Sequence, residues 1–107
     1  MNRNLHLRSR DLRAFLEENS SRIAGRSGDE ECCPITEFFR CKKNMTVRAC
    51  HGEIIDGANS KNRRPMTAWE KKFVDTFDDY CEEGQWVSGE EALQVLDEVT
   101  TRKRSWL

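Results

Sequence analysis

The segment Thr67–Gly84, with the sequence TAWEKKFVDTFDDYCEEG, decides how this chain of 107 residues folds. It begins with a capping box, because Glu70 follows Thr67 by three residues and the two side chains bind the free amides of a helix start. Large side chains then recur at intervals of four, four and three residues: Trp69, Phe73, Phe77 and Tyr80. Such intervals place them on one side of a helix, which Gly84 ends. The segment therefore predicts a helix whose aromatic side is part of a core.

Three other segments show helical spacing, so the sequence predicts about four helices. The first extends from about Ser9 to Gly25. The second begins at Pro34, whose missing amide hydrogen is no loss at a first helical position. The last begins with a second capping box, Ser88 with Glu91. The apolar residues of the three segments are, in order, Leu12, Phe15, Leu16 and Ile23; Ile35, Phe38 and Phe39; Ala92, Leu93, Leu96 and Val99.

Between the second and third helices the spacing changes to two. Apolar and polar residues alternate over Met45–Cys50, and another β-rich run, Glu53–Ile55, follows the pair His51-Gly52. Two short strands joined by a pair ending in glycine predict a β-hairpin. The polar stretch Asp56–Pro65 is expected to be a mobile loop. The predicted fold is a small, mostly helical α+β domain with a short hairpin between its second and third helices.

Length and composition set further limits. A chain of 107 residues fits one domain, so we expect residues 1–107 to form it, with 1–8 and 100–107 as flexible ends. No run approaches the roughly 18 apolar residues of a membrane-spanning helix. The first ten residues also lack the apolar core of a signal peptide. We therefore expect a cytoplasmic location and no membrane partner.

Charge is distributed unevenly along the chain. The formal net charge is only -1, from 18 basic and 19 acidic residues. Met66–Val99 nevertheless contains ten acidic residues and two basic ones, and the segments on either side are basic overall. Within it, four acidic residues share one side of the predicted third helix: Asp75, Asp78, Asp79 and Glu82. Like charges at these spacings repel by about 0.2–0.5 kcal/mol per pair, so this side is either solvated or bound to a basic surface.

The cysteines suggest one alternative function, a small zinc-stabilised module. The count of five is odd and no leader is evident, which argues against a disulfide framework. Zinc requires four converging ligands, usually supplied as close-spaced pairs, and no Cys-x-x-Cys pair is present. The candidate ligands are Cys33, Cys41, Cys50 and His51. We expect the cysteines to be small buried hydrophobes instead, and no cofactor.

Basic residues suggest a second alternative, nucleic-acid binding through a basic loop and a basic tail. The residues concerned are Lys61, Arg63, Arg64, Arg102, Lys103 and Arg104. An isoelectric point near 6.1 and an acidic third helix both disfavour phosphate binding. The sequence also lacks a phosphate-binding loop, a dinucleotide fingerprint and a recognisable pair of nucleophile and base. We therefore expect neither a nucleic-acid partner nor an enzyme.

Several short motifs connect the chain with known sequences. They are the Leu12–Leu16 helix, Gly25-Arg26, Cys33-Pro34-Ile35, Trp69 with Phe73, and Ser88–Leu93. Through them, the stretch from about Arg8 to Asp97 resembles a group of short, uncharacterised proteins of cyanobacteria, actinobacteria and phages. No activity is known for that group, so the resemblance implies a compact fold and supplies no catalytic residue.

These observations lead to a prediction about function. We expect a non-enzymatic protein-interaction module, an inhibitor or adaptor such as a phage accessory protein, that binds a basic partner. The expected binding residues are the four acidic ones of the third helix together with Trp86 or Trp106, because large amphipathic aromatics commonly anchor interfaces. A helix stripe can also face a second copy of the chain, so a homo-oligomer is compatible with the sequence.

Overall fold

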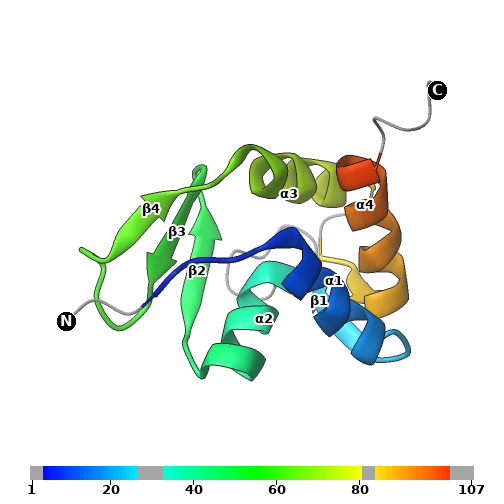
Figure 1. The fold of residues 1–107 in the computed structure, drawn as a ribbon, viewed down its shortest axis with the longest axis horizontal. Helices are drawn as coiled ribbons and strands as arrows, with labels where there is room; N and C mark the ends of the chain where they lie inside the picture. The colour runs from blue at the N-terminus through cyan, green and yellow to red at the C-terminus, as the bar shows by residue number, and fades with distance from the viewer. Residues whose placement is uncertain (1–3, 27–32, 81–83, 102–107) are drawn as a thin grey trace.

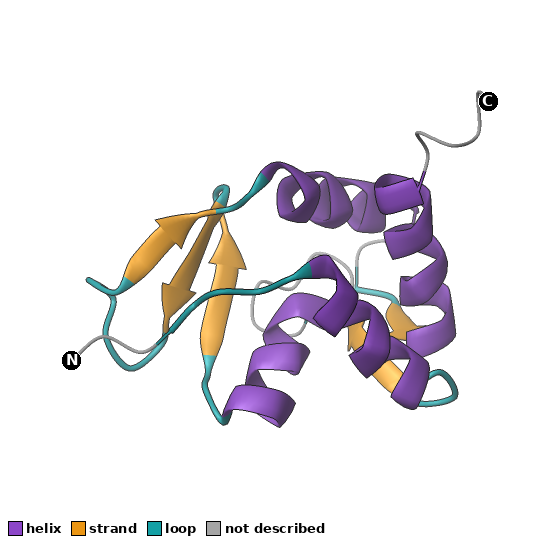
Figure 2. Cartoon of the chain, viewed as in Figure 1, coloured by secondary structure: helices purple, strands orange, loops and turns teal. Residues whose placement is uncertain are grey.

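The computed structural model describes residues 4–26, 33–80 and 84–101, and these ranges form the predicted α+β fold (Figure 1). Four helices and an antiparallel sheet between the second and third of them are present. The elements are α1 (Ser9–Glu18), β1 (Ile23–Arg26), α2 (Pro34–Lys43), β2 (Val47–Cys50), β3 (Glu53–Asp56), β4 (Arg63–Pro65), α3 (Ala68–Tyr80), β5 (Trp86–Ser88) and α4 (Gly89–Thr101). In Figure 2 the sheet occupies one side of the molecule and α1, α3 and α4 the other, with α2 between them.

The predicted hairpin is confirmed as the pair β2–β3. Cys50 lies opposite Glu53, so the connecting turn has two residues. These are His51 and Gly52, with φ angles of 52° and 75°. Positive φ at both central positions is the signature of a type I′ turn, whose twist matches that of the two strands.

The segment Asp56–Pro65, expected to be a loop, contains a third strand. β4 pairs antiparallel with β3 and completes a sheet of order β2-β3-β4. The preceding turn is organised by Asp56, which is 2% exposed. Its carboxylate accepts hydrogen bonds from the Ala58 amide at 2.9 Å and from the Asn62 side chain at 3.2 Å. Aspartate commonly bonds to backbone two residues ahead in this way, which makes the turn compact.

The first helix is shorter than its apolar spacing suggests. α1 ends at Glu18, and the Asn19 side chain donates a hydrogen bond to the Phe15 carbonyl at 2.8 Å. Asparagine and serine bond to nearby backbone in this way, and they follow here in succession, which disfavours further helix. Ile23 therefore belongs to β1, which pairs antiparallel with β5 in a separate two-stranded sheet.

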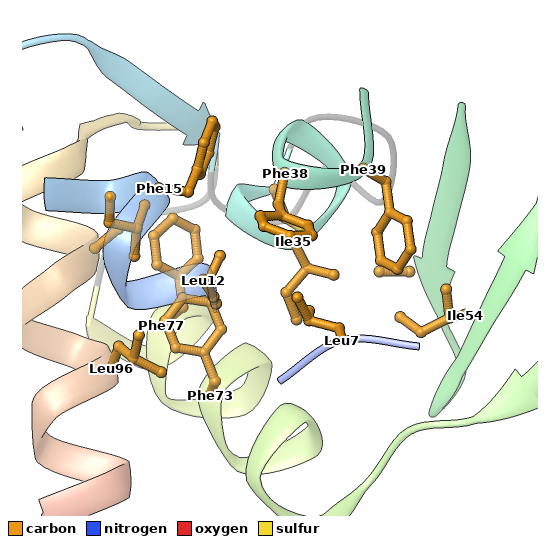
Figure 3. Close-up of a cluster of buried hydrophobic side chains, with 14 of the residues drawn as sticks. Leu7, Leu12, Phe15, Ile35, Phe38, Phe39, Ile54, Phe73, Phe77 and Leu96 are labelled. Carbon is orange, nitrogen blue, oxygen red and sulfur yellow. The ribbon is translucent and has the colours of Figure 1, made fainter. Parts of the chain in front are cut away.

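The core lies between the helices and the inner side of the three-stranded sheet (Figure 3). Two of the aromatic residues predicted to share one side of α3, Phe73 and Phe77, are buried there and stack at 5.9 Å between ring centroids, and Trp69 packs half-buried against the core. The side chain of Tyr80 lies outside the described residues. Phe38 of α2 meets Phe15 of α1 edge to face at 5.8 Å. Edge-to-face and offset-stacked pairs are the favourable aromatic geometries, so one continuous core holds the helices together.

An extended segment, residues 4–8, precedes α1 and is called the arm below. Leu5 and Leu7 are 6% and 4% exposed and belong to the core, although residues 1–8 were expected to form a flexible end. Burial of both leucines places the arm against the sheet and the helices. Across the described ranges, no helix combines the length and apolar character needed to cross a membrane.

Candidate functional site

The acidic face, defined as Asp75, Asp78 and Asp79, lies on the C-terminal half of α3. All three side chains are exposed, as their spacing predicts. The start of α3 is fixed by the predicted capping box, because Glu70 Oε1 accepts hydrogen bonds from the Thr67 amide at 2.8 Å and hydroxyl at 3.0 Å. With Phe73 and Phe77 buried, the opposite side of the helix faces outward. Glu82 lies outside the described residues.

The position of the acidic face is unfavourable for its own helix. The last turn of α3 contains Asp78 and Asp79 and no basic residue. The C-terminal end of a helix dipole is negative, and each carboxylate there costs about 0.3–1 kcal/mol. Asp75 and Asp79 also repel one another, because they are four residues apart. Helix stability therefore does not explain these aspartates.

Ion pairs within the fold do not offset this charge at two of the three positions. In the part of the chain that the structure describes, Asp75 and Asp79 have no cationic partner within 4 Å. Other carboxylates do, because Arg13 pairs with Asp97 across α1 and α4, and Lys42 lies 2.8 Å from Glu18. The chain thus pairs several other carboxylates and leaves Asp75 and Asp79 to the solvent.

A shallow cleft of about 500 Å³ runs beside the outward side of α3. Its described lining is Ala68, Lys71, Lys72, Asp75 and Thr76. Both lysines precede the acidic face along the helix and are exposed. The outward side is therefore positive towards its N-terminal half and negative towards its C-terminal half, so a partner of matching charge order fits it in one direction only.

Trp86 is exposed as an interface anchor should be. Its exposed fraction is 54%, and it is the one large hydrophobic side chain in the described ranges that is exposed. It lies on β5, opposite Arg26 of β1, and so on a different element from the acidic face. Trp106, the other predicted anchor, lies outside the described residues.

The structure does not bring the candidate zinc ligands together. Cys33 is buried beside the start of α2, Cys41 is exposed on that helix, and Cys50 is half-buried at the end of β2. His51 is exposed in the hairpin turn. Across residues 4–26, 33–80 and 84–101, no three His, Cys, Asp or Glu side chains form a group that could hold a metal ion. Burial raises the pKa of the Cys33 thiol, which keeps it protonated and unreactive.

Three of the candidate nucleic-acid residues lie in the described part of the chain: Lys61, Arg63 and Arg64. Lys61 is exposed, and Arg63 on β4 lies 3.4 Å from Glu53 of β3. Its neighbour Arg64 points to the other side of the strand, where its guanidinium binds the Glu70 carboxylate. Arg102, Lys103 and Arg104 lie outside the described residues. Of the three described loop cations, Arg64 is therefore not available to bind a phosphate group.

Arg64 and Glu70 form a buried ion pair that sequence reasoning missed. Glu70 is fully buried, and its two carboxylate oxygens accept hydrogen bonds from Arg64 Nη1 at 2.6 Å and Nη2 at 2.8 Å. The same guanidinium also binds the Leu5 carbonyl. The available signal was the alternation of a strand, which places adjacent arginines on opposite sides of a sheet.

Comparisons with known proteins add no relative. Neither a protein-family model nor a curated protein nor a solved structure matches this chain. Its function has to be inferred from its own residues and their geometry.

Proposed function

We propose that this protein is a non-enzymatic interaction module of the cytoplasm, an inhibitor or adaptor, that binds a basic surface of another protein through the acidic face of α3. The supporting observation is that Asp75 and Asp79 are exposed, have no ion pair in the described part of the fold and lie where they weaken their helix. A lysine- or arginine-rich partner surface offsets both the mutual repulsion and the unfavourable dipole.

Trp86 complements the acidic face in this proposal. Charges at the edge of an interface mainly accelerate and orient association, whereas buried aromatics supply much of the affinity. An indole that is 54% exposed on β5 offers such an anchor. The partner is a protein and not a nucleic acid, because the acidic face repels phosphate and Arg64 is bound to Glu70.

The experiment compares capture of partners by two charge-reversed variants of the tagged full-length chain. Asp75→Lys/Asp79→Lys removes the acidic face. Glu17→Lys/Glu98→Lys is the matched control, because it makes the same change in net charge at two exposed carboxylates in the C-terminal halves of other helices. We expect the wild type and the control to retain the same partner, and the acidic-face variant to bind it at least roughly tenfold more weakly. Equal capture by all three chains contradicts the proposal.

A further inference from the structure

The arm lies in a groove that recognises it by two leucines and by its backbone. Leu5 and Leu7 are buried, whereas Asn4, His6 and Arg8 are exposed, which is the alternation of an extended chain. In Figure 3 the side chains of Leu7 and Ile35 point toward one another. The groove thus takes side chains at every second position of an extended segment.

The arm's backbone is held by side chains of the groove and not by pairing with a strand. The Leu5 carbonyl accepts hydrogen bonds from Arg64 Nε at 2.9 Å and Nη2 at 2.7 Å, and the His6 carbonyl accepts one from Lys43 Nζ at 2.6 Å. Residues 4–7 make no backbone–backbone hydrogen bond within the described part of the chain. Contacts of this kind depend on carbonyl positions and on leucine spacing, and they are the same whichever molecule supplies the segment.

One of the two cationic donors is held in place without the arm. Arg64 is fixed by its two hydrogen bonds to the buried Glu70. Lys43 is on α2, with its ammonium 5.2 Å from the centre of the Phe39 ring, and its hydrogen bonds go to carbonyls of the arm. A donor that is already positioned loses little conformational entropy when a segment binds. The Arg64 end of the groove is therefore preorganised for an incoming extended segment.

The junction between the arm and α1 allows the arm to swing out. Arg8 precedes the helix with φ -102° and ψ 144°, and its side chain makes no capping hydrogen bond. Its carbonyl accepts the amides of Asp11 and Leu12, and rotation on the N-terminal side of Arg8 leaves both bonds intact. When the arm leaves the groove, it therefore loses its own contacts, and the hydrogen bonds within α1 are kept.

We propose that this groove is a binding site for an extended Leu-x-Leu segment, and that residues 4–8 of a second copy of the chain occupy it in an arm-exchanged dimer. Exchange of an identical segment preserves every contact of the arm. The equilibrium between the monomer and the arm-exchanged dimer therefore depends on protein concentration and on the strain of the junction. The proposal uses none of the acidic-face residues and stands apart from the proposed function.

The test deletes Arg8 from the full-length chain. An extended residue spans about 3.4 Å, so the shortened arm cannot place both leucines in its own groove. We expect the deleted chain to dimerise at least about a thousandfold more tightly than the wild type, whose own arm competes at a millimolar effective concentration. Adding Leu5→Ser/Leu7→Ser abolishes the dimer, whereas the matched change Asn4→Ala/His6→Ala at the exposed positions retains it. Light scattering on a sizing column measures all four chains.

A folded, monomeric Arg8-deleted chain overturns the proposal, and so does a dimer that survives loss of both leucines. A second measurement uses the intact junction. Tagged and untagged wild-type chains are unfolded, mixed and refolded at increasing concentration. We expect mixed dimers that increase with concentration and are absent from the Leu5→Ser/Leu7→Ser chain; their absence at every concentration also overturns the proposal.

Discussion

At the scale of single residues, Arg64 and Glu70 make the most consequential contact in the fold. Removing one member of a buried ion pair leaves the other uncompensated. Glu70 is fully buried and Arg64 mostly so, and we expect Glu70→Ala to lower the free energy of unfolding by about 3 kcal/mol. Arg63→Ala, which breaks the exposed pair with Glu53, is the control and costs less than about 1 kcal/mol. Urea unfolding of both variants checks this, and an equal loss of unfolding free energy in the two would contradict the importance of the buried pair.

Gly89 lies where two backbone segments pack too closely to admit a side chain. A Cβ at this position would lie 2.2 Å from the Asn19 carbonyl oxygen and 2.9 Å from that of Leu16. The Gly89 amide also donates to the Arg22 carbonyl at 2.9 Å, which fixes the start of α4 against the segment between α1 and β1. Alanine normally stabilises a helix relative to glycine. Here we expect Gly89→Ala to destabilise the protein by about 1–3 kcal/mol or more in thermal unfolding, and a raised melting temperature would refute this packing.

Cys33 gives a prediction with a defined pH dependence. Burial raises the pKa of its thiol above the ordinary 9.0, so the folded chain keeps a proton that the unfolded chain loses. Stability that depends on this group is therefore complete below about pH 9 and decreases as the pH rises above it. Native protein treated with an alkylating reagent should be modified at the exposed Cys41 long before Cys33, as peptide mass spectrometry can show. Rapid modification of Cys33 in the folded protein would contradict its burial.

At the scale of elements, α3 combines a strong start with an unfavourable end. Its capping box stabilises the N-terminus, while Asp78 and Asp79 oppose the dipole at the C-terminus. Because lysine at this end of the helix is favoured by the dipole and aspartate is not, we expect Asp79→Lys to raise the free energy of unfolding by about 0.3–1 kcal/mol. Chemical denaturation measures the change. A lower stability would mean that Asp79 has a stabilising partner within the fold.

The sequence predicts some elements well and others poorly, for identifiable reasons. Signals contained in a few adjacent residues succeed: Ser88 and Glu91 bond reciprocally at 3.2 and 3.3 Å, the Glu70 carboxylate accepts the Thr67 amide, and the two-residue hairpin turn is present. The strands β1, β4 and β5 have three or four residues each and are about as short as β2 and β3, but no two-residue turn ending in glycine joins them to a partner strand. β1 and β5 also pair across most of the chain, and nothing local in the sequence specifies such a partner.

At the scale of the whole molecule, the net charge of -1 combines charges that are paired within the fold with charges that are not. Arg13, Lys42 and Arg64 are engaged by carboxylates of the fold, whereas Asp75 and Asp79 are left without such partners in the described ranges. Spacing along α3 was enough to predict that the acidic residues share one side. Which basic residues would be engaged elsewhere depends on tertiary packing, and so does the burial of Leu5 and Leu7. The sequence therefore identified the acidic face but not the lack of ion pairs at Asp75 and Asp79 in the described ranges.

The most direct test of the acidic face is the salt dependence of partner binding. With a captured partner in hand, its dissociation constant is measured for the wild type and for Asp75→Lys/Asp79→Lys between about 0.05 and 0.3 M salt, a range over which screening becomes strong. We predict that wild-type affinity falls steeply with salt, while the variant binds weakly and almost independently of salt. Equal affinities with equal salt dependence would contradict the central claim that the acidic face of α3 binds a basic surface.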